Sequence, residues 1–82
     1  MEAMDMRDIE AVLEGILFAA GEPVALDRIC QAVDADPETV EKVLRKLEDY
    51  YSYERRGIRL IRMEESYQLC SAPEYADVIR RT

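Results

Sequence analysis

Apolar residues recur at helical spacing near the start of the chain. If residues 7–20 form a helix, these apolar residues line one side of it. They are Ile9, Val12, Leu13, Ile16, Leu17 and Ala20. Gly21 follows, and glycine commonly ends a helix because it adopts the left-handed conformation without strain. Pro23 disfavours helix at the residue before it. The sequence therefore predicts a first helix over residues 7–20 and a very short strand over residues 22–24.

Two further amphipathic segments follow, joined by a tight connection at residues 34–36. Residues 26–32 are predicted to form a short helix, whose inward positions continue to the residue just after it: Leu26, Ile29, Cys30 and Val33. Asp36 is a favourable N-cap, and Pro37 suits the first helical position because it needs no amide partner there. Residues 37–51 are then predicted to form a third helix, with an unbroken apolar stripe: Val40, Val43, Leu44, Leu47, Tyr50 and Tyr51.

The helical pattern ends at Gly57, and the residues after it are typical of strands. Residues 58–63 and 67–71 are predicted strands, with residues 64–66 as the turn between them. A short helical segment follows over residues 74–79. A helix-turn-helix followed by a β-hairpin is the winged-helix arrangement, so we expect a mainly α fold with a small β-hairpin (α+β), built from three helices plus a wing. We expect residues 1–72 to form this domain and residues 73–82 to begin a linker or helix leading to a second domain.

The predicted hairpin is apolar on both faces. With a three-residue turn, one face carries Ile61, Met63, Tyr67 and Leu69, and the other carries Ile58, Leu60 and Cys70. One face can cover the core, which leaves the other for a protein partner, because domains seldom expose a contiguous apolar patch without use. We expect that partner to contact Ile61, Met63, Tyr67 and Leu69. The alternative is that the last helical segment covers this face.

The first helix also has an apolar residue off its stripe. At about 100° per residue, Phe18 lies almost opposite the centre of the stripe. Ala11 and Gly15 lie on the same side, and small residues beside an aromatic side chain allow another helix to approach closely. These three residues are therefore a candidate dimer interface. The alternative is that Phe18 packs under the wing or the final segment.

Composition excludes several function classes. The chain has 82 residues and no histidine, and its three glycines form no phosphate-binding loop. Without histidine, imidazole-dependent triads are ruled out and the commonest metal ligand is missing. Cys30 and Cys70 lack partner cysteines at metal-ligand spacing and are expected to be reduced in the cytoplasm. We therefore predict no enzyme activity, no metal and no cofactor. No apolar run approaches the roughly 18 residues of a membrane span, and the acidic N-terminus is not a secretory signal.

Charge argues against DNA as the main partner. The net charge is −7, whereas phosphate backbones attract basic surfaces. The exposed face of the would-be recognition helix, residues 37–51, combines four acidic with three basic residues and has no Asn or Gln for reading adenine. The wing region carries four arginines that could make weak DNA contacts: Arg55, Arg56, Arg59 and Arg62. Arg59 and Arg62 are an odd number of residues apart, so they point to opposite strand faces and form no continuous stripe.

The chain resembles the bacterial segregation and condensation protein B family. The most specific segment is residues 17–23, Leu-Phe-Ala-Ala-Gly-Glu-Pro, within the longer match over residues 9–24. Residues 57–60, 67–69 and 73–75 continue the match in the family's order and spacing. The resemblance covers nearly the whole chain and is specific as a set.

The resemblance implies a function in chromosome condensation and segregation. Members of the family have two tandem winged-helix domains, dimerise, and bind the kleisin ScpA, through which they meet the SMC protein of the bacterial condensin. The resemblance therefore implies that this chain is a non-enzymatic adaptor that forms a homodimer. It also implies a cytoplasmic protein associated with the nucleoid, whose contact with nucleic acid is at most indirect or weak. A DNA-binding winged-helix transcriptional regulator is the alternative.

Overall fold

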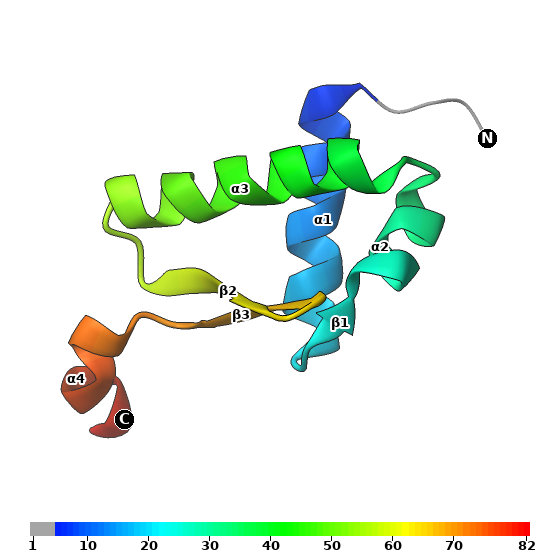
Figure 1. Cartoon of the computed structure of the whole chain (residues 1–82). Coiled ribbons are helices and arrows are strands. Elements are labelled where there is room, and N and C mark those ends of the chain that lie inside the picture. Colours follow the sequence, from blue (N-terminus) through cyan, green and yellow to red (C-terminus); the bar gives the residue numbers. More distant parts are fainter. Residues whose placement is uncertain (1–4) are drawn as a thin grey trace.

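The computed structural model describes residues 5–82, and these residues form a winged helix followed by a short helical tail (Figure 1). The predicted fold class is therefore confirmed. The helices are α1 (Met6–Ala20), α2 (Leu26–Val33), α3 (Pro37–Tyr53), the 3-10 turn η1 (Pro73–Tyr75) and α4 (Ala76–Arg80). The strands are β1 (Val24–Ala25), β2 (Ile58–Met63) and β3 (Ser66–Ser71). The predicted domain start at residue 1 lies outside the described residues.

Helix α1 is capped at both ends. Asp5 is its N-cap, and the carboxylate of Asp5 accepts a 3.0 Å hydrogen bond from the backbone amide of Asp8. Gly21 adopts a left-handed conformation with φ 65°, and its amide donates to the carbonyl of Leu17. The predicted stop at Gly21 is confirmed. The helix begins one residue earlier than predicted, because Asp5 and not a later residue supplies the cap.

The second and third helices also keep close to their predicted bounds. Asp34 ends α2 in a left-handed conformation, with φ 53°. Asp36 occupies the N-cap position of α3, but its carboxylate accepts a hydrogen bond of 2.6 Å from the Thr39 hydroxyl and none from a backbone amide. That hydrogen bond lowers the pKa of Asp36. Helix α3 extends two residues beyond the predicted end.

The three strands form an antiparallel sheet in the order β1-β3-β2. Strand β1 was predicted at residues 22–24 and instead begins after Pro23, which has no amide to donate to a neighbouring strand. Val24 pairs with Tyr67, and the amide of Leu26 donates to the carbonyl of Glu65 at 2.8 Å. The start of α2 is thereby joined to the tip of the hairpin.

The hairpin turn is one residue shorter than predicted. Met63 pairs with Ser66, so only Glu64 and Glu65 form the turn. Glu64 adopts a left-handed conformation with φ 53°, which permits the tight turn without glycine. The predicted three-residue turn is therefore wrong, and the register of every cross-strand pair shifts by one residue.

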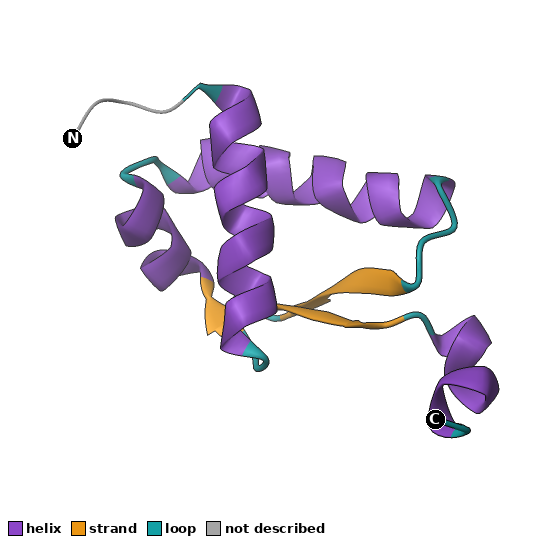
Figure 2. Ribbon diagram, turned by 180° about the vertical axis from the view of Figure 1, so that it is seen from behind, coloured by secondary structure: helices purple, strands orange, loops and turns teal. Residues whose placement is uncertain are grey.

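One core lies between the three helices and the inner face of the sheet, with α3 above the hairpin and α1 crossing α3 (Figures 1 and 2). Its buried members are Ile9, Leu13, Leu17, Ile29, Val33, Val40, Val43, Leu44, Leu47, Tyr51, Leu60 and Tyr67. No residue after Ala72 is buried, and α4 extends away from this core (Figure 2). The predicted apolar stripes of the helices supply most of the core.

Candidate protein-binding surfaces

The outer side of α1 carries an exposed aromatic side chain. Phe18 is 78% exposed, and Ala11 and Gly15 beside it are also exposed. A methyl group placed on Gly15 would meet nothing within 4 Å. In the view from behind, α1 lies in front of α3, and no other described element covers its outer side (Figure 2). Phe18 therefore packs neither under the wing nor under the final segment, and the structure brings all three predicted residues onto one open face.

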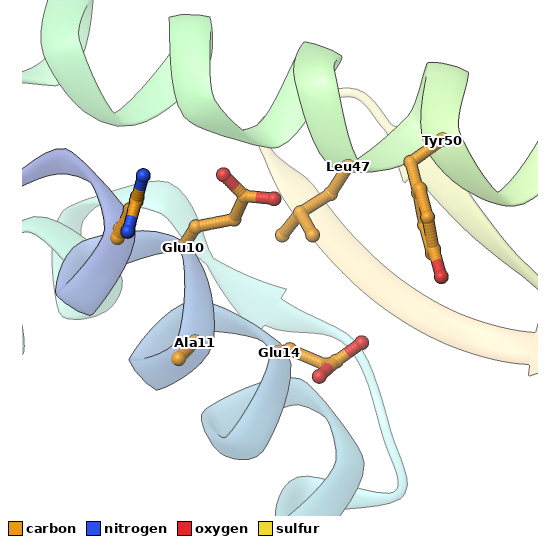
Figure 3. Close-up of a pocket in the computed structure, with 6 residues that line it drawn as sticks. Glu10, Ala11, Glu14, Leu47 and Tyr50 are labelled. Carbon is orange, nitrogen blue, oxygen red and sulfur yellow. The ribbon is translucent and has the colours of Figure 1, made fainter.

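A groove between α1 and α3 adjoins this face, and sequence reasoning missed it. Figure 3 shows Leu47 and Tyr50 projecting from α3 toward α1, where Ala11 leaves space. The groove has a volume of about 300 Å³. We call it the α1–α3 groove, and its lining residues are Arg7, Glu10, Ala11, Glu14, Leu47 and Tyr50. Leu47 is 3% exposed and Tyr50 48% exposed, so the groove has an apolar floor and an accessible aromatic wall.

Polar contacts fix the two helices on either side of the α1–α3 groove. The Tyr51 hydroxyl donates a hydrogen bond to the Glu14 carboxylate. Burial, followed by this hydrogen bond, raises the pKa of Tyr51 far above its usual value. The Lys46 ammonium lies 3.4 Å from the Glu10 carboxylate. Both glutamates that line the groove therefore have a partner on α3.

The hairpin does not bring together the four residues predicted to bind a partner. In the observed register, Leu60 pairs with Leu69 and Arg62 with Tyr67. Tyr67 and Leu69 therefore share the core-facing side with Leu60, and Tyr67 is only 6% exposed. The prediction that Tyr67 and Leu69 lie on an outward face with Ile61 and Met63 is wrong, because the two-residue turn exchanges the faces of β3 relative to β2.

Ile61 and Met63 remain on the outer face of the hairpin. They are 37% and 39% exposed and lie opposite Gln68 and Ser66. Strand β2 also has a strand partner on one side only among residues 5–82. An edge strand with exposed apolar side chains offers both backbone hydrogen bonds and side-chain contacts to an extended peptide. This outer face and the β2 edge form the second candidate surface.

The four wing arginines lie in different surroundings. The Arg59 guanidinium pairs with the Glu74 carboxylate and donates to the carbonyls of Arg56 and Ile58, at 2.6 and 2.9 Å. Its side chain is 15% exposed, and its ion pair with Glu74 joins β2 to the chain that leaves the hairpin. Arg62 borders a small crevice whose other walls include Glu41 and Glu48. Arg55 and Arg56 are exposed at the end of α3.

Among residues 5–82, no group of three or more Cys, Asp or Glu side chains could hold a metal ion. Cys30 and Cys70 are half-buried free thiols, and burial, with a contribution from Asp27, raises the pKa of the Cys30 thiol. In the same described range, no helix is long and apolar enough to span a membrane. The exposed apolar side chains of Phe18, Ile61 and Met63 remain the candidate sites for protein contacts.

Residues 11–82 match the family of the segregation and condensation complex subunit ScpB. The chain belongs to this family. It is 37% identical over 78 residues to the segregation and condensation protein B of Ruminiclostridium cellulolyticum and 42% identical over 78 residues to that of Syntrophotalea carbinolica. Each match covers 95% of this chain but only 41% and 40% of the relatives, so the chain spans about two fifths of their length.

Solved ScpB structures share the fold. ScpB from Mycobacterium tuberculosis superimposes with a TM-score of 0.92 at 21% identity, over 98% of this chain and 50% of that one. A dimer of an ScpB N-terminal domain, complexed with an ScpA peptide, superimposes with a TM-score of 0.87 at 25% identity. This second match covers 93% of the present chain and 95% of the other. The winged helix described here therefore corresponds to an ScpB N-terminal domain.

Proposed function

We propose that this chain is a non-enzymatic adaptor of the SMC–kleisin condensin, acting in chromosome condensation and segregation by forming a homodimer and binding the kleisin ScpA. The observation that carries the proposal is the match, along nearly the full length of both chains, to an ScpB N-terminal domain that was crystallised as a dimer with an ScpA peptide. Contact with the SMC protein is made through the kleisin. The protein acts in the cytoplasm, where the complex places it at the nucleoid.

The two exposed surfaces support separate sites for self-association and for kleisin binding. The outer face of α1, with Ala11, Gly15 and Phe18, serves self-association. The outer face of the hairpin, with Ile61 and Met63, serves the kleisin, since exposed strands accept an extended segment by β-augmentation. The net charge of −7 favours a partner segment that brings basic residues and speeds its encounter at low salt.

The proposal keeps the predicted boundary between the winged-helix domain and the linker. Residues up to 72 form the winged-helix domain, and residues 73–82 begin a linker toward a second winged-helix domain. The burial pattern supports this division, because Ala72 is fully buried whereas none of residues 73–82 is buried. The Arg59–Glu74 ion pair then sets the direction in which the linker leaves the domain.

Calorimetric titration with purified ScpA tests kleisin binding. We expect Ile61→Asp and Met63→Asp to weaken binding by about thirtyfold or more, which corresponds to roughly 2 kcal/mol for a hot-spot residue. Val78→Asp is the matched control, since Val78 is an exposed apolar residue on α4, 60% exposed and outside the hairpin. Circular dichroism checks that each variant is folded.

The possible outcomes separate the parts of the proposal. Binding left unchanged by both hairpin substitutions would exclude the outer face of the hairpin as the kleisin site. The absence of heat and of co-elution at high protein concentration would contradict kleisin binding by this domain. Equal weakening by Val78→Asp would show that the effect comes from added charge and would also count against the hairpin site.

A further inference from the structure

Phe18 and the α1–α3 groove lie on the same face of α1, one projecting and the other hollow. Phe18 is 78% exposed, and the groove centres on Ala11. The two positions are seven residues apart, which corresponds to about 10.5 Å along a helix. At about 100° per residue, they also point in nearly the same direction around α1. A protruding ring and a cavity are thus fixed one beside the other on one rigid helix.

This spacing is self-complementary about a two-fold axis. When two identical helices cross in antiparallel orientation, residues at equal distances on either side of the axis meet across the interface. The midpoint of positions 11 and 18 falls between positions 14 and 15. Gly15 therefore lies at the crossing point, where its missing side chain lets the two backbones approach. A two-fold axis perpendicular to α1 also keeps the groove and the ring on the same flank of the helix.

We propose that two copies of this chain associate through antiparallel α1 helices, with Phe18 of each copy seated in the α1–α3 groove of the other. The proposal rests on the self-association proposed above and specifies its interface. The groove volume of about 300 Å³ is about ten times the roughly 30 Å³ that one water occupies in the liquid, enough for an aromatic ring. The occupant is a second copy because the ring that fits lies on the chain's own surface at the required distance.

The chemistry of the α1–α3 groove suits a phenyl ring. Leu47 gives it an apolar floor, and Tyr50 presents an aromatic wall for an edge-to-face contact. Arg7 places a guanidinium group at the rim, where it can lie against the ring. The carboxylate of Glu10 is paired with Lys46, and that of Glu14 with the Tyr51 hydroxyl. Each carboxylate therefore keeps a partner when an entering ring displaces water from the groove.

Sedimentation equilibrium of single variants tests both halves of the contact. Phe18→Ser removes the ring and Tyr50→Ser opens the groove, and each is expected to raise the dimer dissociation constant by at least about thirtyfold. The controls are Val12→Ser, on the opposite flank of α1, and Tyr53→Ser, which is 85% exposed on α3 but outside the groove. Both controls are expected to dimerise as the parent does.

A charge pair tests the antiparallel arrangement. Phe18→Lys and Ala11→Glu should each weaken the dimer, whereas the double variant should dimerise more strongly than either single variant, because the introduced lysine of one copy then faces the introduced glutamate of the other. In a parallel arrangement, like charges would meet and the double variant would stay monomeric. Stronger dimerisation of the double variant than of either single variant supports the proposal, and weaker dimerisation than both overturns it.

Failure of this inference can be told apart from failure of the proposed function. A dimeric parent whose dissociation constant is unchanged by Phe18→Ser would overturn the ring-in-groove interface and leave self-association standing. A parent that remains monomeric at high concentration would overturn both. Calorimetry with ScpA reports on kleisin binding independently of either result.

Discussion

The hydroxyl group of Tyr51 donates a hydrogen bond to the carboxylate of Glu14 and so joins α3 to α1. The Tyr51 side chain is 2% exposed, and Glu14 also lines the α1–α3 groove. A buried polar group needs a partner, because leaving it unsatisfied costs free energy. This contact therefore links the stability of the core to the shape of the proposed dimer interface.

Tyr51→Phe removes this hydrogen bond while retaining the ring in the core. We expect the free energy of unfolding to fall by about 1.5–3 kcal/mol, the range for hydrogen bonds to charged groups. Urea denaturation, monitored by circular dichroism, measures the change in the free energy of unfolding. Tyr53→Phe is the control, since Tyr53 is 85% exposed and its change should stay within about 0.5 kcal/mol. Equal stability of the Tyr51→Phe variant and the parent would contradict the role assigned to this contact.

Alkaline pH should destabilise the domain through the same residue. The pKa of Tyr51 is raised on folding, mainly by burial and then by the hydrogen bond to Glu14. The stabilisation is then complete below the unfolded tyrosine pKa of about 10 and is lost as the pH rises toward the folded value. The free energy of unfolding, measured from about pH 8 to about pH 11, should therefore fall less steeply with rising pH for Tyr51→Phe than for the parent.

A second tyrosine also contributes to the loss of stability at alkaline pH. Burial also raises the pKa of Tyr67, with the charge of Arg62 opposing the effect. The Tyr51→Phe variant should therefore retain a weaker alkaline dependence. Parallel stability curves for the parent and the variant would mean that Tyr51 titrates no differently in the folded and unfolded states.

The sequence predicted the helices well because local signals mark them. Apolar stripes define the buried sides of α1, α2 and α3, and Gly21 and Pro37 mark a helix end and a helix start. The N-cap Asp5 was missed, although an acidic residue three positions before Asp8 is a recognisable cap signal. These features depend on nearest neighbours along the chain, so one sequence is enough to find them.

The candidate sites were harder to predict because they depend on tertiary register. No glycine or asparagine marks Glu64 as a left-handed residue, so the turn length could not be read and Tyr67 was placed on the wrong face. The α1–α3 groove needs two helices to be placed against each other, and the pairing of Arg59 with Glu74 joins residues that lie fifteen positions apart. Only the exposed face around Phe18 followed from helical periodicity alone.

Glu64→Gly should stabilise the domain. A side chain in the left-handed region costs roughly 1–2 kcal/mol, partly offset by the greater backbone entropy that glycine loses on folding, so we expect a gain of about 1 kcal/mol. This corresponds to a rise in Tm of about 4–8 °C for a domain of this size. Glu65→Gly is the control, because Glu65 has no positive φ and gains nothing from the substitution. A lower Tm for Glu64→Gly would contradict the observed turn.

DNA binding should be weak and independent of sequence. The exposed face of α3 is mixed in charge, Lys46 is paired with Glu10, and Arg59 is engaged with Glu74. We expect fluorescence anisotropy at physiological salt to show at most a weak association that disappears as salt is raised. Arg55→Ala combined with Arg56→Ala should abolish any residual signal. Submicromolar affinity that differs between DNA sequences would favour a transcriptional regulator instead.

Light scattering during size-exclusion chromatography tests the central claim most directly, because it gives the mass of the chain alone and with ScpA. We predict a species of twice the 9.5 kDa chain mass, which shifts to a larger mass when purified ScpA is added. Ile61→Asp should keep the doubled mass and lose the shift, because self-association and kleisin binding use different faces. A monomeric mass for the parent, or no shift with ScpA at any concentration reached, would contradict the account.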